Sequence, residues 1–82
     1  MKLTVKLFAT LKDRAQTDRL VVELKDDQPT VTDLLTEISI QKPELKSSLK
    51  SVLVAVNKEF SFAEQVILTN DEIALFPPVS GG

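Results

Sequence analysis

Glycine is the feature that most constrains how this chain can fold, because its only two glycines, Gly81 and Gly82, are the last two residues. Tight turns usually take glycine where φ is positive. Residues 1–80 must therefore form every turn with other residue types. The freedom of glycine is concentrated at the C-terminus, where two residues without side chains would pass through a narrow tunnel.

The residues before the two glycines predict a stiff, extended tail. Pro77 and Pro78 fix φ and lack an N–H, so they cannot simply continue a central strand. They favour a polyproline conformation with a solvated backbone. Six extended residues reach about 20 Å, and the far end carries the unhindered α-carboxylate of Gly82. A frayed terminus is the alternative interpretation.

The chain is expected to have a single folded domain, since 82 residues leave no room for a second core. We predict a globular domain over residues 1–76 and a C-terminal tail over residues 77–82. The predicted tail-insertion residues are Pro77, Pro78, Val79 and Ser80.

Composition argues against several functions. A net charge of −2, with no tryptophan or tyrosine, argues against a nucleic-acid surface. Because cysteine and histidine are both absent, we expect no disulfide, no metal site and no bound cofactor. The longest apolar run, residues 52–56, is far too short to span a membrane. We therefore expect a cytoplasmic protein without nucleic-acid or membrane partners.

Alternation of apolar and polar residues predicts the strands. Residues 1–8 and 19–24 alternate with a period of two, which is typical of half-buried strands. Residues 52–56 are apolar on both faces, as in a central strand. A short alternation at 60–62 and a final strand at 73–76 complete the set.

One stretch predicts a substantial helix. Thr30 is a candidate N-cap, and Asp33 lies three residues later in a variant of the capping box. Pro43 ends the helix, because the residue before proline avoids the α region. An apolar stripe with helical spacing follows the cap, formed by Val31, Leu34, Leu35 and Ile38.

Shorter segments are predicted from single features. Residues 9–15 contain one apolar anchor and are interpreted as a helical turn or loop. Leu45 and Leu49 are one turn apart and indicate a short second helix. Asn70 is expected to adopt the left-handed conformation in the turn before the last strand.

The order of elements is strand, strand, helix, strand, short strand, strand. This order predicts an α+β fold with a mixed sheet of four to five strands and one main helix on one face. The other face of such a sheet is left available for partners.

At full length the sequence resembles the small subunit of molybdopterin synthase, the MoaD family. The resemblance rests on Leu7-Phe8-Ala9, on Val54-Ala55-Val56-Asn57, on the turn Asn70-Asp71-Glu72 and on Phe76-Pro77-Pro78-Val79-Ser80-Gly81-Gly82. It implies a ubiquitin-like β-grasp fold and a sulfur carrier for molybdenum cofactor biosynthesis, with Gly82 as the working residue beside Gly81.

The resemblance also implies partners. A ubiquitin-activating-type adenylyltransferase would use ATP to adenylate Gly82, and sulfur from a donor protein would convert its carboxylate into a thiocarboxylate. The large synthase subunit would use that sulfur to build the molybdopterin dithiolene, in a heterotetramer. The active site is expected in the large subunit, since this chain contains no catalytic constellation of its own.

The phenylalanines predict where a partner docks. Phe8 and Phe76 lie on the face opposite the core residues of their strands. In a β-grasp sheet the first and last strands are parallel neighbours, so both rings should lie at the base of the tail. We predict a docking patch of Phe8, Phe76 and Phe60, and we expect Phe62 to pack in the core.

Other interpretations remain open. The same tail fits a carrier for thiazole or another sulfur pathway, or a ubiquitin-like protein modifier. A β-grasp interaction module with an incidental tail is a third class, and it would keep its function without Gly81 and Gly82. Ser80 lacks a histidine base and is interpreted as a small spacer. The acidic pairs at 26–27 and 71–72 are interpreted as solvated turns, not metal ligands.

Overall fold

The main feature of the fold is a five-stranded sheet with the strand order β2-β1-β5-β3-β4. The computed structural model describes residues 1–78. β1 and β5 are parallel and all other neighbours are antiparallel, so the predicted mixed sheet is confirmed. The strands are β1 (Lys2–Leu7), β2 (Arg19–Glu23), β3 (Leu53–Val56), β4 (Glu59–Phe60) and β5 (Ile73–Phe76).

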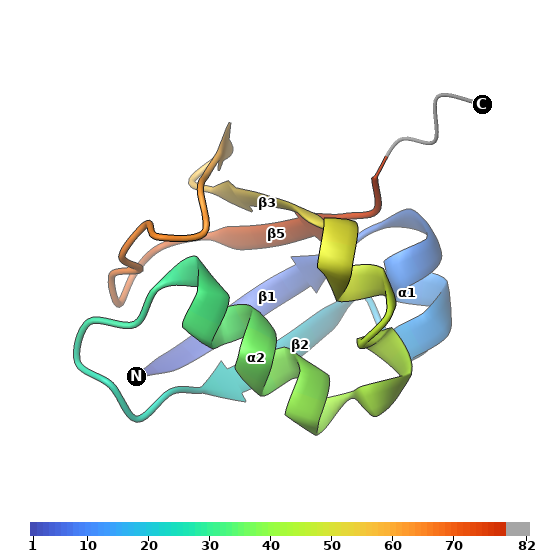
Figure 1. The fold of residues 1–82 in the computed structure, drawn as a ribbon, viewed down its shortest axis with the longest axis horizontal. Coiled ribbons are helices and arrows are strands. Elements are labelled where there is room, and N and C mark those ends of the chain that lie inside the picture. Colours follow the sequence, from blue (N-terminus) through green and yellow to red (C-terminus); the bar gives the residue numbers. More distant parts are fainter. Residues whose placement is uncertain (79–82) are drawn as a thin grey trace.

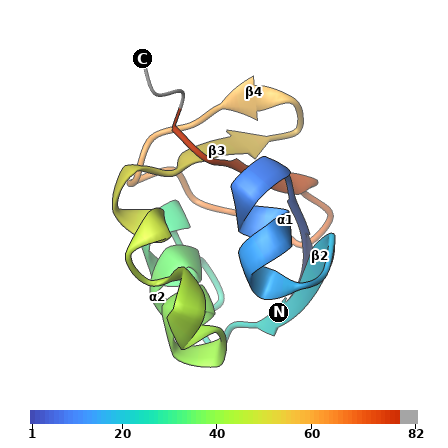
Figure 2. The same cartoon turned by 90° about the vertical axis from the view of Figure 1, so that its right-hand side faces the viewer.

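The helical elements pack on one face of this sheet. Figure 2 shows α2 on one side of the strands, with β4 at the sheet edge beyond β3. α1 packs against η1, which follows α2, so it belongs to the same side. None of the helices between residues 1 and 78 is long and apolar enough to cross a membrane. The helical elements are α1 (Ala9–Ala15), α2 (Val31–Gln41), η1 (Pro43–Leu45) and η2 (Ser48–Ser51).

The first helix is more regular than its sequence predicts. Residues 9–15 form a seven-residue α-helix with Leu11 and Ala15 buried. Gln16 ends the helix in the left-handed conformation, with φ of 60°. Leu11 and the small Ala15 are sufficient to anchor the helix, because η1 packs against it and fixes it against the core.

The core lies between α2 and the inner face of the sheet. Leu3, Val5 and Leu7 of β1 are buried, whereas the residues between them are exposed. α2 buries Val31, Leu34 and Ile38 of the predicted stripe, and Leu35 packs at its margin. Each fully buried Leu, Ile or Val side chain contributes about 1.5–3 kcal/mol, so this interface makes a large contribution to the stability of the fold.

The predicted capping box at the start of α2 is confirmed. The Thr30 hydroxyl accepts a hydrogen bond from the Asp33 N–H at 3.3 Å. In return, the Asp33 carboxylate accepts one from the Thr30 N–H at 2.9 Å. The helix ends at Gln41, two residues before Pro43, and this agrees with the predicted stop.

The segment between β4 and β5 contradicts the prediction for Phe62. This side chain is 78% exposed, whereas Ile67 is completely buried. A turn in which the Gln65 N–H donates to the Phe62 carbonyl redirects the chain. The Ile67 N–H then donates to the Pro29 carbonyl, and Ile67, not Phe62, is the residue of this segment that packs in the core.

The turns use other residues in place of glycine, but Asn70 is not one of them. Positive φ occurs at Ala9, Gln16, Asn57 and Lys58, and not at Asn70, so the Asn70 prediction is wrong. The turn before β5 is instead closed by hydrogen bonds to the Asp71 carboxylate.

Asn57 is the residue that ties the two turns together. Its amide donates to one Asp71 carboxylate oxygen at 2.9 Å and accepts from the Glu72 N–H at 2.9 Å. The other Asp71 oxygen accepts from the Leu68 N–H at 2.8 Å. One side chain with a φ of 54° therefore joins the β3–β4 hairpin to the start of β5.

Replacing Asn57 by alanine should destabilise the fold by about 2 kcal/mol, because it removes two side-chain hydrogen bonds. Alanine also lacks the short polar side chain that makes the left-handed conformation tolerable for asparagine. Asn57→Gly keeps the backbone conformation and should cost less. Asn70→Ala should change stability by no more than about 0.5 kcal/mol. Urea unfolding of the three variants measures this, and equal losses for Asn57→Ala and Asn70→Ala would contradict the assignment.

Candidate docking site at the base of the tail

The candidate site lies on the face of the sheet that α2 does not cover. Alternate residues of β1 point outward here, including Lys6, and Phe8 continues the same parity beyond the strand end. The parallel register pairs Lys6 with Ala74, which brings Phe8 beside Phe76. On the other side of β5, Phe76 pairs with Leu53 of β3. The predicted approach of the first and last strands is therefore confirmed.

Three aromatic rings meet at this point. Phe8 and Phe76 stack with ring centroids 4.7 Å apart and planes inclined by 9°. Phe60 meets Phe76 edge-on, at 6.2 Å and 80°. Phe8 is 40% exposed and Phe60 is 71% exposed, so the cluster faces outward. The predicted three-residue patch thus exists as a contiguous surface, and its role in docking stays a prediction.

A groove of about 280 Å³ runs through this cluster. Its floor is formed by Ala55 and Ala74, whose small side chains let a partner approach the sheet closely. Charged groups stand at its rim. The lining residues are Lys6, Phe8, Ala55, Lys58, Phe60, Glu72, Ala74 and Phe76.

The groove lies where the folded domain passes into the tail. β5 ends at Phe76, and the chain continues through the half-buried Pro77 to the exposed Pro78. Figure 1 shows β5 ending on the side of the molecule where α1 lies, away from the loop between β2 and α2. The predicted tail residues Val79, Ser80, Gly81 and Gly82 lie outside the described residues, so their roles stay predictions, as does the boundary at residue 76.

The sequence prediction missed Leu53 and the two alanines of the floor. Leu53 is 39% exposed and extends the patch along Phe76. Parity along residues 52–56 could have placed Leu53 and Ala55 opposite the core residues Val54 and Val56. Parity could not show that Leu53 lies beside Phe76 and Ala55 beside Ala74, because these contacts depend on the register between β3 and β5.

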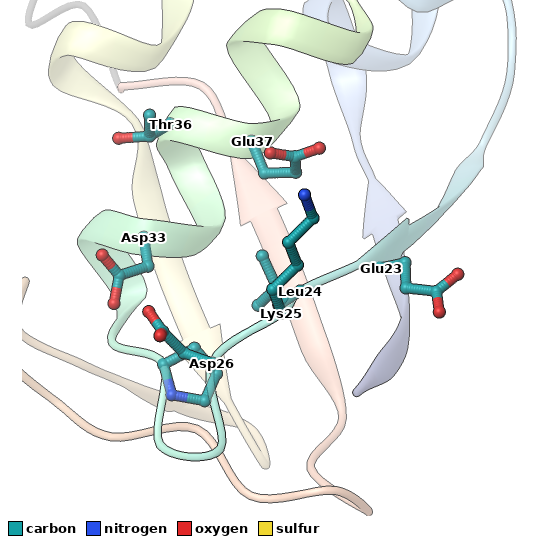
Figure 3. Close-up of a pocket in the computed structure, with 8 residues that line it drawn as sticks. Glu23, Leu24, Lys25, Asp26, Asp33, Thr36 and Glu37 are labelled. Carbon is teal, nitrogen blue, oxygen red and sulfur yellow. The ribbon is translucent and has the colours of Figure 1, made fainter.

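A second hollow, of about 310 Å³, lies at the opposite end of the sheet. Figure 3 shows the carboxylates of Asp26, Asp33 and Glu37 around it, with the Lys25 amine extending toward Glu37. Asp33 is already engaged in the capping box of α2. Within residues 1–78 no group of three potential ligands is placed to hold a metal ion. The hollow is best explained as the solvated turn that leads into α2.

The mixed five-stranded sheet, packed on one main helix and carrying a C-terminal segment on its parallel β5 strand, defines a ubiquitin-like β-grasp protein. Among solved structures, SAMP1 from Haloferax volcanii superposes with a TM-score of 0.88 at 32% identity, with 100% of both chains covered. The β-grasp prediction is confirmed.

Sequence comparison identifies the family. Residues 5–82 match the ThiS family, and the chain belongs to it. The molybdopterin synthase sulfur carrier subunit of Dictyostelium discoideum is 38% identical over 93% of this chain and 91% of its own length. The protein of the same name from Escherichia coli is 32% identical over 98% of this chain and 99% of its own length. The resemblance to the MoaD family is thus confirmed.

Phe60→Ala should barely change stability, because a ring that is 71% exposed loses little burial, and we expect a cost below about 1 kcal/mol. Leu75→Ala, on the core face of β5, should cost about 2–5 kcal/mol. Urea unfolding curves of both variants measure the contrast. Equal costs would mean that Phe60 belongs to the core and does not form part of a surface.

Proposed function

We propose that this chain is the sulfur carrier subunit of a molybdopterin synthase, in which the C-terminal carboxylate is adenylated, converted into a thiocarboxylate and used as a sulfur donor for the molybdopterin dithiolene. The observation that carries this proposal is the similarity, along the whole chain, to relatives that bear that name. The family match extends through residue 82 and so includes the terminal pair of glycines.

The geometry supports the same function. The aromatic patch adjoins the end of β5, and Pro77 and Pro78 follow directly. A partner that binds the patch therefore receives the tail at its own surface. Because proline restricts the backbone before binding, less entropy is lost when the tail enters a narrow site. Six extended residues reach about 20 Å beyond the patch, which allows Gly82 to enter a buried active site.

The chemistry explains why the tail ends in glycine. A carboxylate is a poor acyl donor until one oxygen becomes part of a good leaving group. Adenylation with ATP joins that oxygen to AMP and releases pyrophosphate. A sulfur nucleophile then displaces AMP and leaves sulfur on the acyl carbon of Gly82. Splitting one difficult substitution into two easier steps is the usual gain from a covalent intermediate. Gly81 and Gly82 leave the acyl carbon open to attack.

Three partners follow from this scheme. An adenylyltransferase of the ubiquitin-activating type supplies the ATP site, a sulfur donor protein supplies sulfur, and the large synthase subunit takes the thiocarboxylate in a heterotetramer. The catalytic groups belong to these partners, and the carrier itself binds no cofactor. Because adenylation consumes ATP, we place the carrier in the cytoplasm.

Deleting Gly81 and Gly82 should abolish sulfur loading while leaving the domain folded, because the reacting carboxylate is displaced and the described core is untouched. The measurement is intact mass after incubation with the matching adenylyltransferase, ATP and a sulfur source. The full chain should exchange one terminal oxygen for sulfur. An unchanged full-length chain, with an enzyme shown to be active on another carrier, would overturn the proposal.

Replacing Phe8 and Phe76 by alanine should weaken binding to the large subunit about 30-fold or more, as expected when buried aromatic anchors worth about 2 kcal/mol are lost. Phe62→Ala is the matched control, since Phe62 is 78% exposed and lies outside the stacked cluster. Calorimetric titration measures affinity, and circular dichroism checks the fold. Unchanged affinity in a folded double variant would remove the docking role.

Protein modification is the second candidate function, and the structural similarity to SAMP1, a small archaeal modifier protein, favours it. A modifier would join the activated Gly82 carbonyl to a lysine amine and release AMP. Mass spectrometry of tryptic digests from cells separates the two functions. No lysine or arginine follows Lys58, so trypsin would leave residues 59–82 attached to a modified lysine. Peptides with this branch, joined through Gly82, would establish modification, whereas a free thiocarboxylate alone would leave the carrier function.

A further inference from the structure

The open face of the sheet carries an unusual pair of charges beside the aromatic patch. Lys6 of β1 and Arg19 of β2 are direct cross-strand partners. Both are exposed, and their positions in the strands place them on the face that α2 does not cover. Like charges directly opposite each other destabilise a sheet, so this pair opposes the fold.

Lys6 forms no ion pair in the described part of the chain, although Glu72 lines the same groove. The one ion pair within residues 1–78 joins Arg19 to Asp18 at 3.3 Å, with both side chains more than half exposed. A pair of that kind contributes little. The positive charge of Lys6 therefore remains available to a partner.

These cations belong to the same surface as the aromatic patch. One row of paired residues crosses all five strands from the charges to the ring: Arg19, Lys6, Ala74, Ala55 and Phe60. A hollow of about 360 Å³ beside Phe8 is lined by Lys6, Lys12 and Arg19, with Asp18 the one carboxylate. Lys6 and Phe8 line both this hollow and the aromatic groove.

The local charge is opposite to that of the whole chain. Acidic residues outnumber basic ones by 12 to 10 overall. The two hollows together are lined by four cations, Lys6, Lys12, Arg19 and Lys58, and by two carboxylates, Asp18 and Glu72. A basic rim around an apolar centre, on a protein whose net charge is negative, is complementary to a partner surface that carries carboxylates.

We infer that Lys6 and Arg19 form a steering and specificity element of the docking site, and that the partner's face presents an apolar side chain to the aromatic groove with carboxylates beside it. The inference rests on the proposed function and commits to the large synthase subunit as that partner. Its carboxylates would relieve the repulsion between Lys6 and Arg19 on binding. The two alanines between the charges and Phe60 leave room for this close approach.

If the inference is right, one substitution should raise the stability of the free protein and slow its binding to the partner. Lys6→Glu creates an opposite-charge cross-strand pair with Arg19, so the melting temperature should rise by about 2–4 °C. Association with the large subunit should be about tenfold slower at roughly 20 mM salt, and the difference should largely vanish at about 500 mM. A loss of folding cannot produce slower binding together with a higher melting temperature.

The matched control is Lys46→Glu, which changes the net charge equally at an exposed position after η1, outside both hollows. Arg19→Glu is an independent second variant that should behave like Lys6→Glu in binding. Stopped-flow mixing at both salt concentrations gives the association rates. Equal slowing by Lys46→Glu would mean that only net charge matters, and it would overturn the inference.

The remaining outcomes separate this inference from the proposed function. If the wild-type chain binds the large subunit and Lys6→Glu associates at the wild-type rate, the steering role is wrong and the carrier function stands. If the wild-type chain loads sulfur but does not bind the large subunit, both the choice of partner and the steering role are wrong. Sulfur loading, measured separately by intact mass, reports on the carrier chemistry alone.

Discussion

The parallel pairing of β1 with β5 is the interaction on which the rest of the structure depends. It joins the first strand to the last one and places Leu7 beside Leu75 in the core. On the opposite face the same register brings Phe8 against Phe76. Because β5 leads directly into Pro77 and Pro78, the contact that closes the fold also sets where the tail leaves it. The core, the aromatic patch and the origin of the tail are thus all positioned by one register.

The sequence predicted most of the fold because its patterns are local. The alternation of apolar and polar residues predicted where β1 and β2 lie in the chain, and Thr30 with Asp33 predicted the start of α2. The predictions for Phe62 and Asn70 were wrong because non-local contacts decide both positions. A hydrogen bond from the Ile67 N–H to the Pro29 carbonyl positions Ile67 in the core, and Phe62 is left exposed. Asp71, bound by Asn57 from another turn, removes any need for a left-handed Asn70.

The candidate site was predictable to the same extent. Parity placed Phe8 and Phe76 on the open face, and the family resemblance predicted that their two strands are neighbours in the sheet. Parity could also have placed Leu53 and Ala55 on this face, but their positions beside Phe76 and Ala74 follow from the register between β3 and β5, which parity along a single strand does not reveal. The opposition of Lys6 and Arg19 depends on register in the same way. Patterns within a strand identify its faces, and pairing between strands identifies the sites on them.

A chain of this size buries only about 60% of its unfolded surface, so its stability is modest. Exposed apolar side chains and unfavourable charge pairs are therefore a larger burden for it than for a large domain. This chain nevertheless leaves three aromatic rings and a like-charge pair on one face. Both features oppose solubility or stability in the free protein, and both lie beside the origin of the tail. A partner that covers the rings and supplies carboxylates removes both costs at once. Under the proposed function, the aromatic patch and the charge pair are therefore the features of one half of an interface, and β5 leads from that interface into Pro77 and Pro78.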